Sequence, residues 1–263
     1  MWGEPYDHST LVRRMAESLI PFSEKWPPVN YIVDPEDPPT AERWIANAYP
    51  SPADLLAAHR AFFDRLFSEP AAAAGFSRWG FKGVRLGGEH ALYLKRIYPD
   101  ARFIFLFRDA RQNISSLLDS WRSRRYVTYP RLPGWPGDNP WSHLLFPGWE
   151  ELVSGSLAEI TAAQWAVTNR TILEDLKALP RERWCAIEYD ALLANTHADL
   201  QRLCTFAEII FGPRMHEIAS RPLRPSKYTL TQPDPDKWKK NATELEGVIA
   251  GTQDLMSELR TLT

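Results

Sequence analysis

The sequence predicts an α/β fold in which a parallel sheet is flanked by helices. Residues 103–107 form an unbroken apolar run of strand length, as a parallel strand covered on both faces requires. The period changes after Arg108, and apolar residues then recur at helical spacing as far as Trp121. A strand-like stretch at 81–84 and a helical stretch at 89–97 come just before this run. The three segments make a strand–helix–strand unit, which implies parallel strands.

Length and composition fit one such domain, and we expect a single domain over residues 1–263. A chain of 263 residues with 44% hydrophobic residues can bury a sizeable core. The net charge of −2 argues against a protein that binds nucleic acid through its overall field. No stretch approaches the roughly 18 apolar residues of a membrane helix. The 6 histidines are scattered without paired spacing, which argues against a metal site.

The segment before the first predicted strand contains two helices. The first ends at Pro21, and residues 27–50, rich in Pro and Asp, are expected to run irregularly over the surface. Ser51 and Pro52 then make a strong helix start, a cap followed by an N1 proline. We expect this second helix to run to about Ser68.

The central strand and the helix after it predict an anion site. Asp109 is placed to cap the helix, and Arg108 ends the strand beside the backbone N–H groups of the helix N-terminus. Open α/β sheets bind ligands at this edge. Ser116 lies off the apolar stripe and leans back toward the same place. The alternative is that Arg108 and Ser116 are ordinary surface residues. The apolar stripe consists of Ile114, Leu117, Leu118 and Trp121.

The second half of the chain continues the alternation of helices and strands. Residues 150–179 support a long helix, interrupted near Gly155, and 184–187 form the next strand with Tyr189 at its end. Further helices are expected at 197–210 and from about Thr243. Cys185 and Cys204 lie in apolar surroundings and are expected to be buried free thiols, for which a reducing cytoplasm is the default location.

Several of these segments, in their order and spacing, resemble sulfotransferases that use 3′-phosphoadenosine 5′-phosphosulfate (PAPS). A strand ending in Arg, a helix and a Ser eight residues later resemble the 3′-phosphate-binding segment of that family. The other matching stretches are 79–85 (WGFKGVR), 187–190 (IEYD), 200–206 (LQRLCTF) and 236–240 (DKWKK). The resemblance spans nearly the whole chain and implies a P-loop-NTPase-like parallel sheet.

The resemblance also implies roles for individual residues. Arg108 and Ser116 would hold the 3′-phosphate, and Tyr189 would contact the nucleotide near adenine, unless it is a buried structural residue. Lys82 would place positive charge on the sulfuryl group in flight. The complete set of cofactor-binding candidates is Arg108, Ser116, Tyr189, Lys227, Trp238 and Lys239.

A base is needed to accept the proton of the acceptor hydroxyl. The cytosolic branch of the family carries a His two residues after the Lys, but Val84 occupies that position here. Tyrosylprotein sulfotransferases instead carry a Glu in a context like that of Glu4, which makes Glu4 our candidate and His8 the second choice. The alternative is that Glu4 is a solvated residue without a catalytic role.

The family opens with a strand and a Gly/Ser/Thr-rich loop around the 5′-phosphosulfate, and this sequence begins at the loop that normally follows. Gly87 and Gly88 have no Ser or Thr beside them and do not replace it. We therefore expect that Met1 is not the natural start or that the chain is a fragment. As written, it would be a weak or inactive transferase with an exposed groove beside 102–107.

The aromatic segment 126–149 contains five prolines and is either an acceptor-binding lid, which we favour, or packing under a long loop. The acceptor would be a small molecule, carbohydrate or peptide that offers a hydroxyl or amine. Two rival functions stay open: a non-catalytic nucleotide-binding protein of this fold, and a P-loop kinase-like phosphotransferase. The kinase ranks last because the sequence contains no G-x-x-x-x-G-K-S/T motif.

Overall fold

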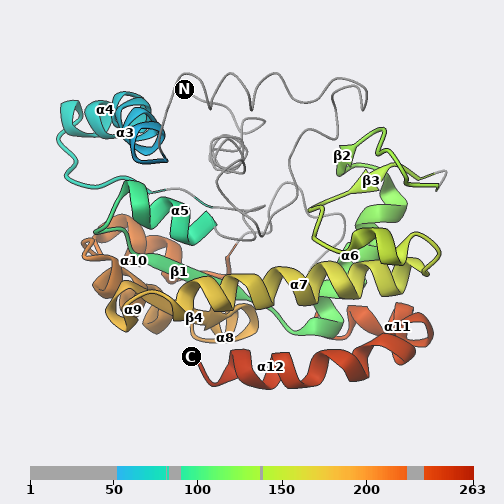
Figure 1. The fold of residues 1–263 in the computed structure, drawn as a ribbon. Helices are drawn as coiled ribbons and strands as arrows, with labels where there is room; N and C mark the ends of the chain where they lie inside the picture. The colour runs from blue at the N-terminus through green and yellow to red at the C-terminus, as the bar shows by residue number, and fades with distance from the viewer. Residues whose placement is uncertain (1–51, 81, 83–89, 137–138, 224–233) are drawn as a thin grey trace.

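The computed structural model describes residues 52–80, 82, 90–136, 139–223 and 234–263. At its centre two strands, β1 (Phe103–Phe107) and β4 (Trp184–Glu188), pair in parallel over their full lengths. The register aligns Phe103 with Trp184 and Phe107 with Glu188, so both strands end at the same edge of the sheet. The predicted α/β fold with a parallel sheet is confirmed (Figure 1).

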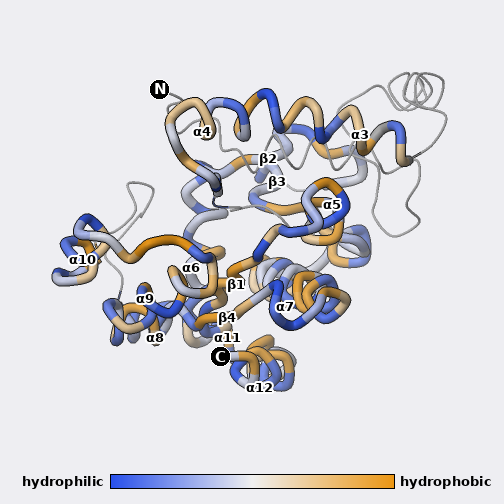
Figure 2. The backbone as a smooth tube through the Cα atoms, turned by 90° about the vertical axis from the view of Figure 1, so that its left-hand side faces the viewer, coloured by the Kyte–Doolittle hydropathy of each residue, from blue (hydrophilic) through white to orange (hydrophobic). Residues whose placement is uncertain are grey.

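Helices cover the pair of strands in two layers (Figure 2). The first layer contains α6 (Ala110–Ser123), α7 (Leu157–Lys177), α11 (Ala242–Ile249) and α12 (Gln253–Arg260). The second layer contains α8 (Tyr189–Ala194) and α9 (Thr196–Ala207), followed by α10 (Pro213–Ala219). Strands thus lie between helices on both sides, as expected when parallel strands are joined by helical crossovers.

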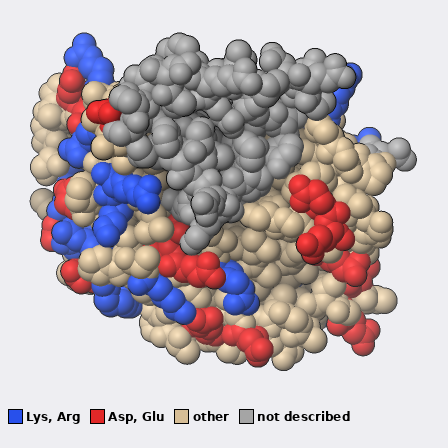
Figure 3. All heavy atoms as spheres, in the orientation of Figure 1, with Lys and Arg blue, Asp and Glu red and all other residues tan. Residues whose placement is uncertain are grey.

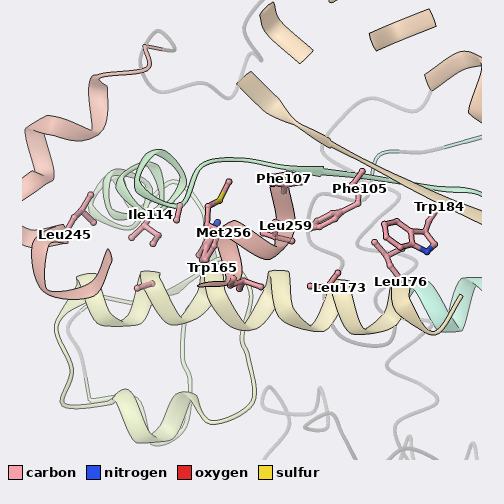
Figure 4. Close-up of a cluster of buried hydrophobic side chains, with 14 of the residues drawn as sticks. Phe105, Phe107, Ile114, Trp165, Leu173, Leu176, Trp184, Leu245, Met256 and Leu259 are labelled. Atoms are coloured by element: carbon pink, nitrogen blue, oxygen red, sulfur yellow. The ribbon is translucent and has the colours of Figure 1, made fainter. Parts of the chain in front are cut away.

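The larger core lies between the sheet and the first layer. Phe105 and Phe107 of β1 and Trp184 of β4 point toward it and pack against the apolar sides of the layer's helices (Figure 4). Each large side chain that leaves water here stabilises the fold by about 1.5–3 kcal/mol. The helix residues labelled in that view are Ile114, Trp165, Leu173, Leu176, Leu245, Met256 and Leu259.

The opposite face of the sheet is covered unevenly. Cys185 and Ile187 of β4 pack against Leu203 of α9. Ile104 and Leu106 of β1, which pair with these two residues, stay 44% and 45% exposed. The prediction that this strand is covered on both faces was therefore wrong, because α9 lies over β4 and leaves β1 open. Their exposure agrees with the open surface expected beside 102–107.

The described helices before β1 lie where the sequence predicts them, and the first extends beyond its predicted end. The helix predicted to end at Ser68 continues as α3 (Pro52–Phe63), a π-helical turn η2 (Asp64–Ser68) and α4 (Glu69–Ala73). The helix predicted at 89–97 is α5 (His90–Ile97). The first predicted helix, which ends at Pro21, and the irregular segment 27–50 both lie outside the described residues. So does the strand predicted at 81–84, except for Lys82, which lies in neither helix nor strand.

The segment 126–149 forms a small cluster of its own. β2 (Val127–Tyr129) and β3 (Trp141–Ser142) pair antiparallel above the end of α6. Trp141, Trp149 and Phe146 are at most 2% exposed and pack around Trp121 of α6. Of the two alternatives, packing under a long loop describes these side chains, and the acceptor-binding role of the segment stays a prediction.

The remaining elements confirm the interrupted helix and the strand after it. A short 3-10 turn η3 (Trp149–Leu152) precedes α7, whose N-cap Ser156 forms a capping box with Glu159. The other short turns are η4 (Arg181–Arg183), η5 (Lys237–Asn241) and η6 (Ala250–Thr252). Cys185 and Cys204 are buried and free, as predicted. On the described part of the visible face, basic side chains lie mainly toward the left and acidic ones along the lower edge and at the right (Figure 3).

Candidate cofactor-binding site

The carboxyl ends of β1 and β4 bring two of the predicted site residues together. Arg108 follows β1 and Tyr189 follows β4, and because the strands are parallel neighbours their ends coincide. The Arg108 guanidinium carbon lies 5.0 Å from the centre of the Tyr189 ring, a cation–π contact. The two residues therefore form one surface at the edge where α/β sheets bind ligands.

A short relay of hydrogen bonds holds Arg108 in this position. Its Nε and Nη2 donate to Gln112 Oε1 at 3.0 and 2.6 Å. Gln112 Nε2 in turn donates to Asp190 Oδ2 at 2.7 Å. The partner of Arg108 is thus a neutral amide, and within the described residues its positive charge has no ion pair. Gln112 and Asp190 were not predicted as site residues, since an amide one turn into a helix gives no sequence signal.

The first turn of α6 differs from the prediction of free backbone donors. Asp109 caps the helix as expected, and its carboxylate accepts the N–H groups of Arg111 and Gln112 at 3.1 and 3.4 Å. Burial alone would raise the pKa of Asp109. The Arg111 guanidinium, the Gln112 N–H and the Arg260 charge outweigh burial, and the pKa lies below its ordinary value. The carboxylate already fills the helix N-terminus, so an anion must be held here by side chains.

Ser116 lies two turns into α6 with an exposed side chain, free to face a ligand. Its neighbour Ser115 points the other way, where its hydroxyl accepts a hydrogen bond from Asn241 Nδ2 at 2.9 Å. Asn241 ends η5, so this contact fixes η5 against α6. The 3-10 turn thereby brings a second set of basic residues to the helix that carries Ser116.

Lys237 at the start of η5 is a further candidate site residue, which sequence reasoning missed. Burial, and then the positive charges of Lys240 and Arg108, lower the pKa of Lys237. Asp119 acts in the opposite direction but does not cancel the shift. In the described part of the chain Lys237 makes no ion pair. Within the described residues neither Arg108 nor Lys237 makes an ion pair, although the Asp119 carboxylate acts on the charge of Lys237.

The two candidates predicted from the same segment are engaged elsewhere. The Trp238 ring lies under the Arg111 guanidinium, whose carbon is 5.0 Å from the ring centre. Lys239 pairs with Asp236 at 2.9 Å, and Lys240 pairs with Asp119 at 2.6 Å. Lys239 and Lys240 thus have carboxylate partners, whereas Lys237 makes no ion pair in the described part of the chain. The sequence letters DKWKK do not reveal this difference.

The catalytic candidates are placed only in part. Lys82 is described and its side chain is exposed. Glu4, His8 and Lys227 lie outside the described residues. The roles of all four stay predictions.

The parallel sheet between layers of helices defines the class of the protein as α/β. The family follows from comparison with known proteins. The model of the sulfotransferase family matches residues 9–213, more than half of the chain, and the chain belongs to that family.

Other comparisons add little detail. A solved structure described as "Sulfotransferase Domain from the Curacin Biosynthetic Pathway" aligns with 19% identity and a TM-score of 0.34. The alignment covers 59% of this chain and 58% of that one, so the chain spans less than two thirds of its length. A comparison with curated proteins gives no match. Among the described helices, none is both long and apolar enough to cross a membrane.

Proposed function

We propose that the chain transfers the sulfuryl group of PAPS to a hydroxyl or amine of a small-molecule, carbohydrate or peptide acceptor. The observation that carries this proposal is the contact of Arg108, whose charge makes no ion pair within the described residues, with Tyr189 at the carboxyl edge of the β1–β4 sheet. A guanidinium without an ion pair at this edge would bind an anion such as a phosphate monoester, and the same anion would favour the charged form of Lys237, whose pKa burial, Lys240 and Arg108 lower. Membership of the sulfotransferase family supports PAPS as the source of that phosphate.

In this proposal the 3′-phosphate of PAPS accepts hydrogen bonds from Arg108, Ser116 and Lys237. The Arg108 guanidinium can bind two phosphate oxygens in one plane, while Lys237 acts as a compact point charge. Tyr189 offers a ring surface beside Arg108 for the adenine. No metal is needed for this binding mode, because side-chain cations supply the positive charge.

Lys82 and Glu4 complete the proposed reaction. Sulfuryl transfer asks for in-line geometry and for positive charge on the oxygens of the group in flight, which Lys82 supplies. Glu4, or else His8, accepts the proton of the acceptor. We place the reaction in a reducing cytoplasm on the strength of the two buried thiols, Cys185 and Cys204.

Binding of adenosine 3′,5′-bisphosphate, measured by titration calorimetry, tests the anion site. Arg108→Ala should weaken binding by about 1.5–3 kcal/mol, the range for hydrogen bonds to charged groups. Lys237→Ala should weaken it by a comparable amount, and Ser116→Ala by less. Lys239→Ala should have a smaller effect than Lys237→Ala, because Lys239 is paired with Asp236.

Arg65→Ala is the matched control, since Arg65 is exposed and, within the described part of the chain, pairs with Glu69 one turn away. If Arg108→Ala and Lys237→Ala bind like the parent chain, the anion site is not where we place it. A screen of acceptor classes with labelled PAPS then separates the rival functions. Bisphosphate binding without turnover on any acceptor would favour the non-catalytic nucleotide-binding protein instead.

A further inference from the structure

Two histidines that are far apart in the sequence meet on the surface of the second helical layer. His197 lies in the first turn of α9 and His216 in α10, and these helices are neighbours in both views of the fold (Figures 1 and 2). His197 Nε2 lies 3.3 Å from His216 Nδ1. Both side chains are exposed. Neither helix carries a residue of the proposed cofactor site.

An aromatic side chain fixes the two imidazole rings in this arrangement. The centre of the Phe211 ring lies 5.1 Å from that of His197 and 4.5 Å from that of His216, both edge to face. Phe211 belongs to the turn between α9 and α10, so the same short segment supports both rings. The pair is thus held by packing as well as by its own hydrogen bond.

The separation of the two nitrogens matches a tetrahedral metal site. Zn²⁺ binds imidazole nitrogen at about 2.0–2.1 Å with tetrahedral geometry, which places two ligand nitrogens about 3.3–3.4 Å apart. The observed 3.3 Å already has this value. We propose that His197 and His216 form a two-histidine binding site for a borderline divalent transition metal ion such as Zn²⁺.

The surroundings leave the other coordination positions to water. The nearest acids along each helix are engaged, Asp199 with Arg202 and Glu217 with Arg221. In the described part of the chain no group of three or more His, Cys, Asp and Glu side chains is arranged to hold a metal. The ion would therefore keep an open, hydrated face, and its effect would be to tie α10 to α9.

The hydrogen bond between the rings must give way when the ion binds. One of the two facing nitrogens now carries the shared hydrogen, and a metal ligand has to be bare. In the bound form each ring keeps its single hydrogen on the nitrogen that faces away, Nδ1 of His197 and Nε2 of His216. The rings stay neutral, so binding needs a change of tautomer and only small ring rotations.

Calorimetric titration of the full chain with Zn²⁺, in a buffer that does not chelate metals, tests the site. We expect one Zn²⁺ per chain. Zn²⁺ should also raise the melting temperature, by about 2–4 °C for each kcal/mol by which it binds the folded chain more strongly than the unfolded chain. His197→Ala and His216→Ala should each weaken binding at least tenfold, roughly the loss of one of two protein ligands. His143→Asn is the matched control, because asparagine tolerates the left-handed backbone at that position, and it should bind like the parent chain.

A second measurement on the unaltered chain does not depend on how the variants fold. With ¹⁵N-labelled histidine, Zn²⁺ should shift the resonances of His197 Nε2 and His216 Nδ1 while those of the buried His59 stay in place. Co²⁺ should report the same site through a visible absorption band. Zn²⁺ binding that survives when His197 and His216 are both replaced by Ala would overturn the proposal. So would His197 and His216 resonances that do not move with saturating Zn²⁺.

Discussion

Burial and the charges of Lys240 and Arg108 make it harder for Lys237 to stay charged, although Asp119 acts in the opposite direction. The lowered pKa of Lys237 records part of that cost. A bound phosphate reverses it, because a dianion held by Arg108 and Lys237 favours their charged forms. Cations without ion pairs would destabilise the fold in a purely structural position, where buried or half-buried cations are normally paired.

Lys82 and Glu4 are expected to act on the reaction rather than on cofactor binding. In an active form of the enzyme, Lys82→Ala and Glu4→Gln should lower turnover by about 10²–10⁴-fold, the usual effect of removing one charge-stabilising or proton-accepting group. Affinity for adenosine 3′,5′-bisphosphate should change little, because the product carries no sulfuryl group. Turnover of Glu4→Gln equal to that of the parent would exclude Glu4 and direct attention to His8.

The sequence placed Arg108 and Tyr189 each at the end of a predicted strand, and they meet because the two strands are parallel neighbours that share one edge. The sequence did not predict Lys237, since the choice among three lysines in one turn depends on which of them finds an acid. Lys239 finds Asp236 and Lys240 finds Asp119, and only three-dimensional contacts distinguish them. Gln112 was missed for the same reason.

At the scale of elements, Asp109 joins the N-terminus of α6 to the C-terminal helix. Its carboxylate caps α6 and also accepts from Arg260 of α12 at 3.3 Å. Asp109→Ala should therefore lower the free energy of unfolding by about 1–2 kcal/mol at neutral pH, the range for a lost N-cap. Asp109→Asn keeps a capping oxygen without the charge and should lose less.

The pH dependence of the free energy of unfolding distinguishes the contribution of the Asp109 charge from that of its capping hydrogen bonds. The folded pKa of Asp109 is lowered, so its contribution is complete above the unfolded value of about 3.9 and is lost as the pH falls through the folded pKa. Urea unfolding curves between pH 7 and pH 2 should show a smaller acid loss in both variants than in the parent chain. Parent-like stability of Asp109→Ala at pH 7 would contradict the capping role.

Element boundaries were predictable where a local signal marks them. Asp109 and Ser156 are N-caps, and both helices begin one residue later. No such local signal shows which face of a strand a helix will cover. Ile104 and Leu106 are apolar residues of a kind that is usually buried, yet α9 lies over β4 and leaves them exposed. Likewise, the aromatic residues of 126–149 were interpreted as an acceptor-binding lid in preference to packing, and only the fold shows that most of them form a core.

At the scale of the whole molecule, α3 is attached to the central layers mainly through α5. Arg60 donates to the carbonyl of Ile97 at 2.6 Å, and Tyr93 Oη lies 2.9 Å from His59 Nδ1. His59 is only 5% exposed, and this burial lowers its pKa from 6.5 to about 4. The packing of α3 on α5 therefore requires a neutral imidazole, and the stability of the molecule becomes linked to a single proton.

The sign of that linkage predicts the acid limb of unfolding. Because the folded pKa is lowered, the unfolded chain binds a proton at His59 first, so stability is full above pH 6.5 and decreases toward about pH 4. At 1.36 kcal/mol per pKa unit, the loss from His59 alone is about 3 kcal/mol. His59→Gln cannot titrate, and its free energy of unfolding should fall by that much less over this range. Tyr93→Phe, which keeps the ring and the burial, should retain most of the parent's slope. The measurement is a set of urea unfolding curves at half-unit steps of pH from 7.5 to 4, above the range in which Asp109 titrates. A slope for His59→Gln equal to that of the parent would show that His59 is hydrated or already charged in the folded chain.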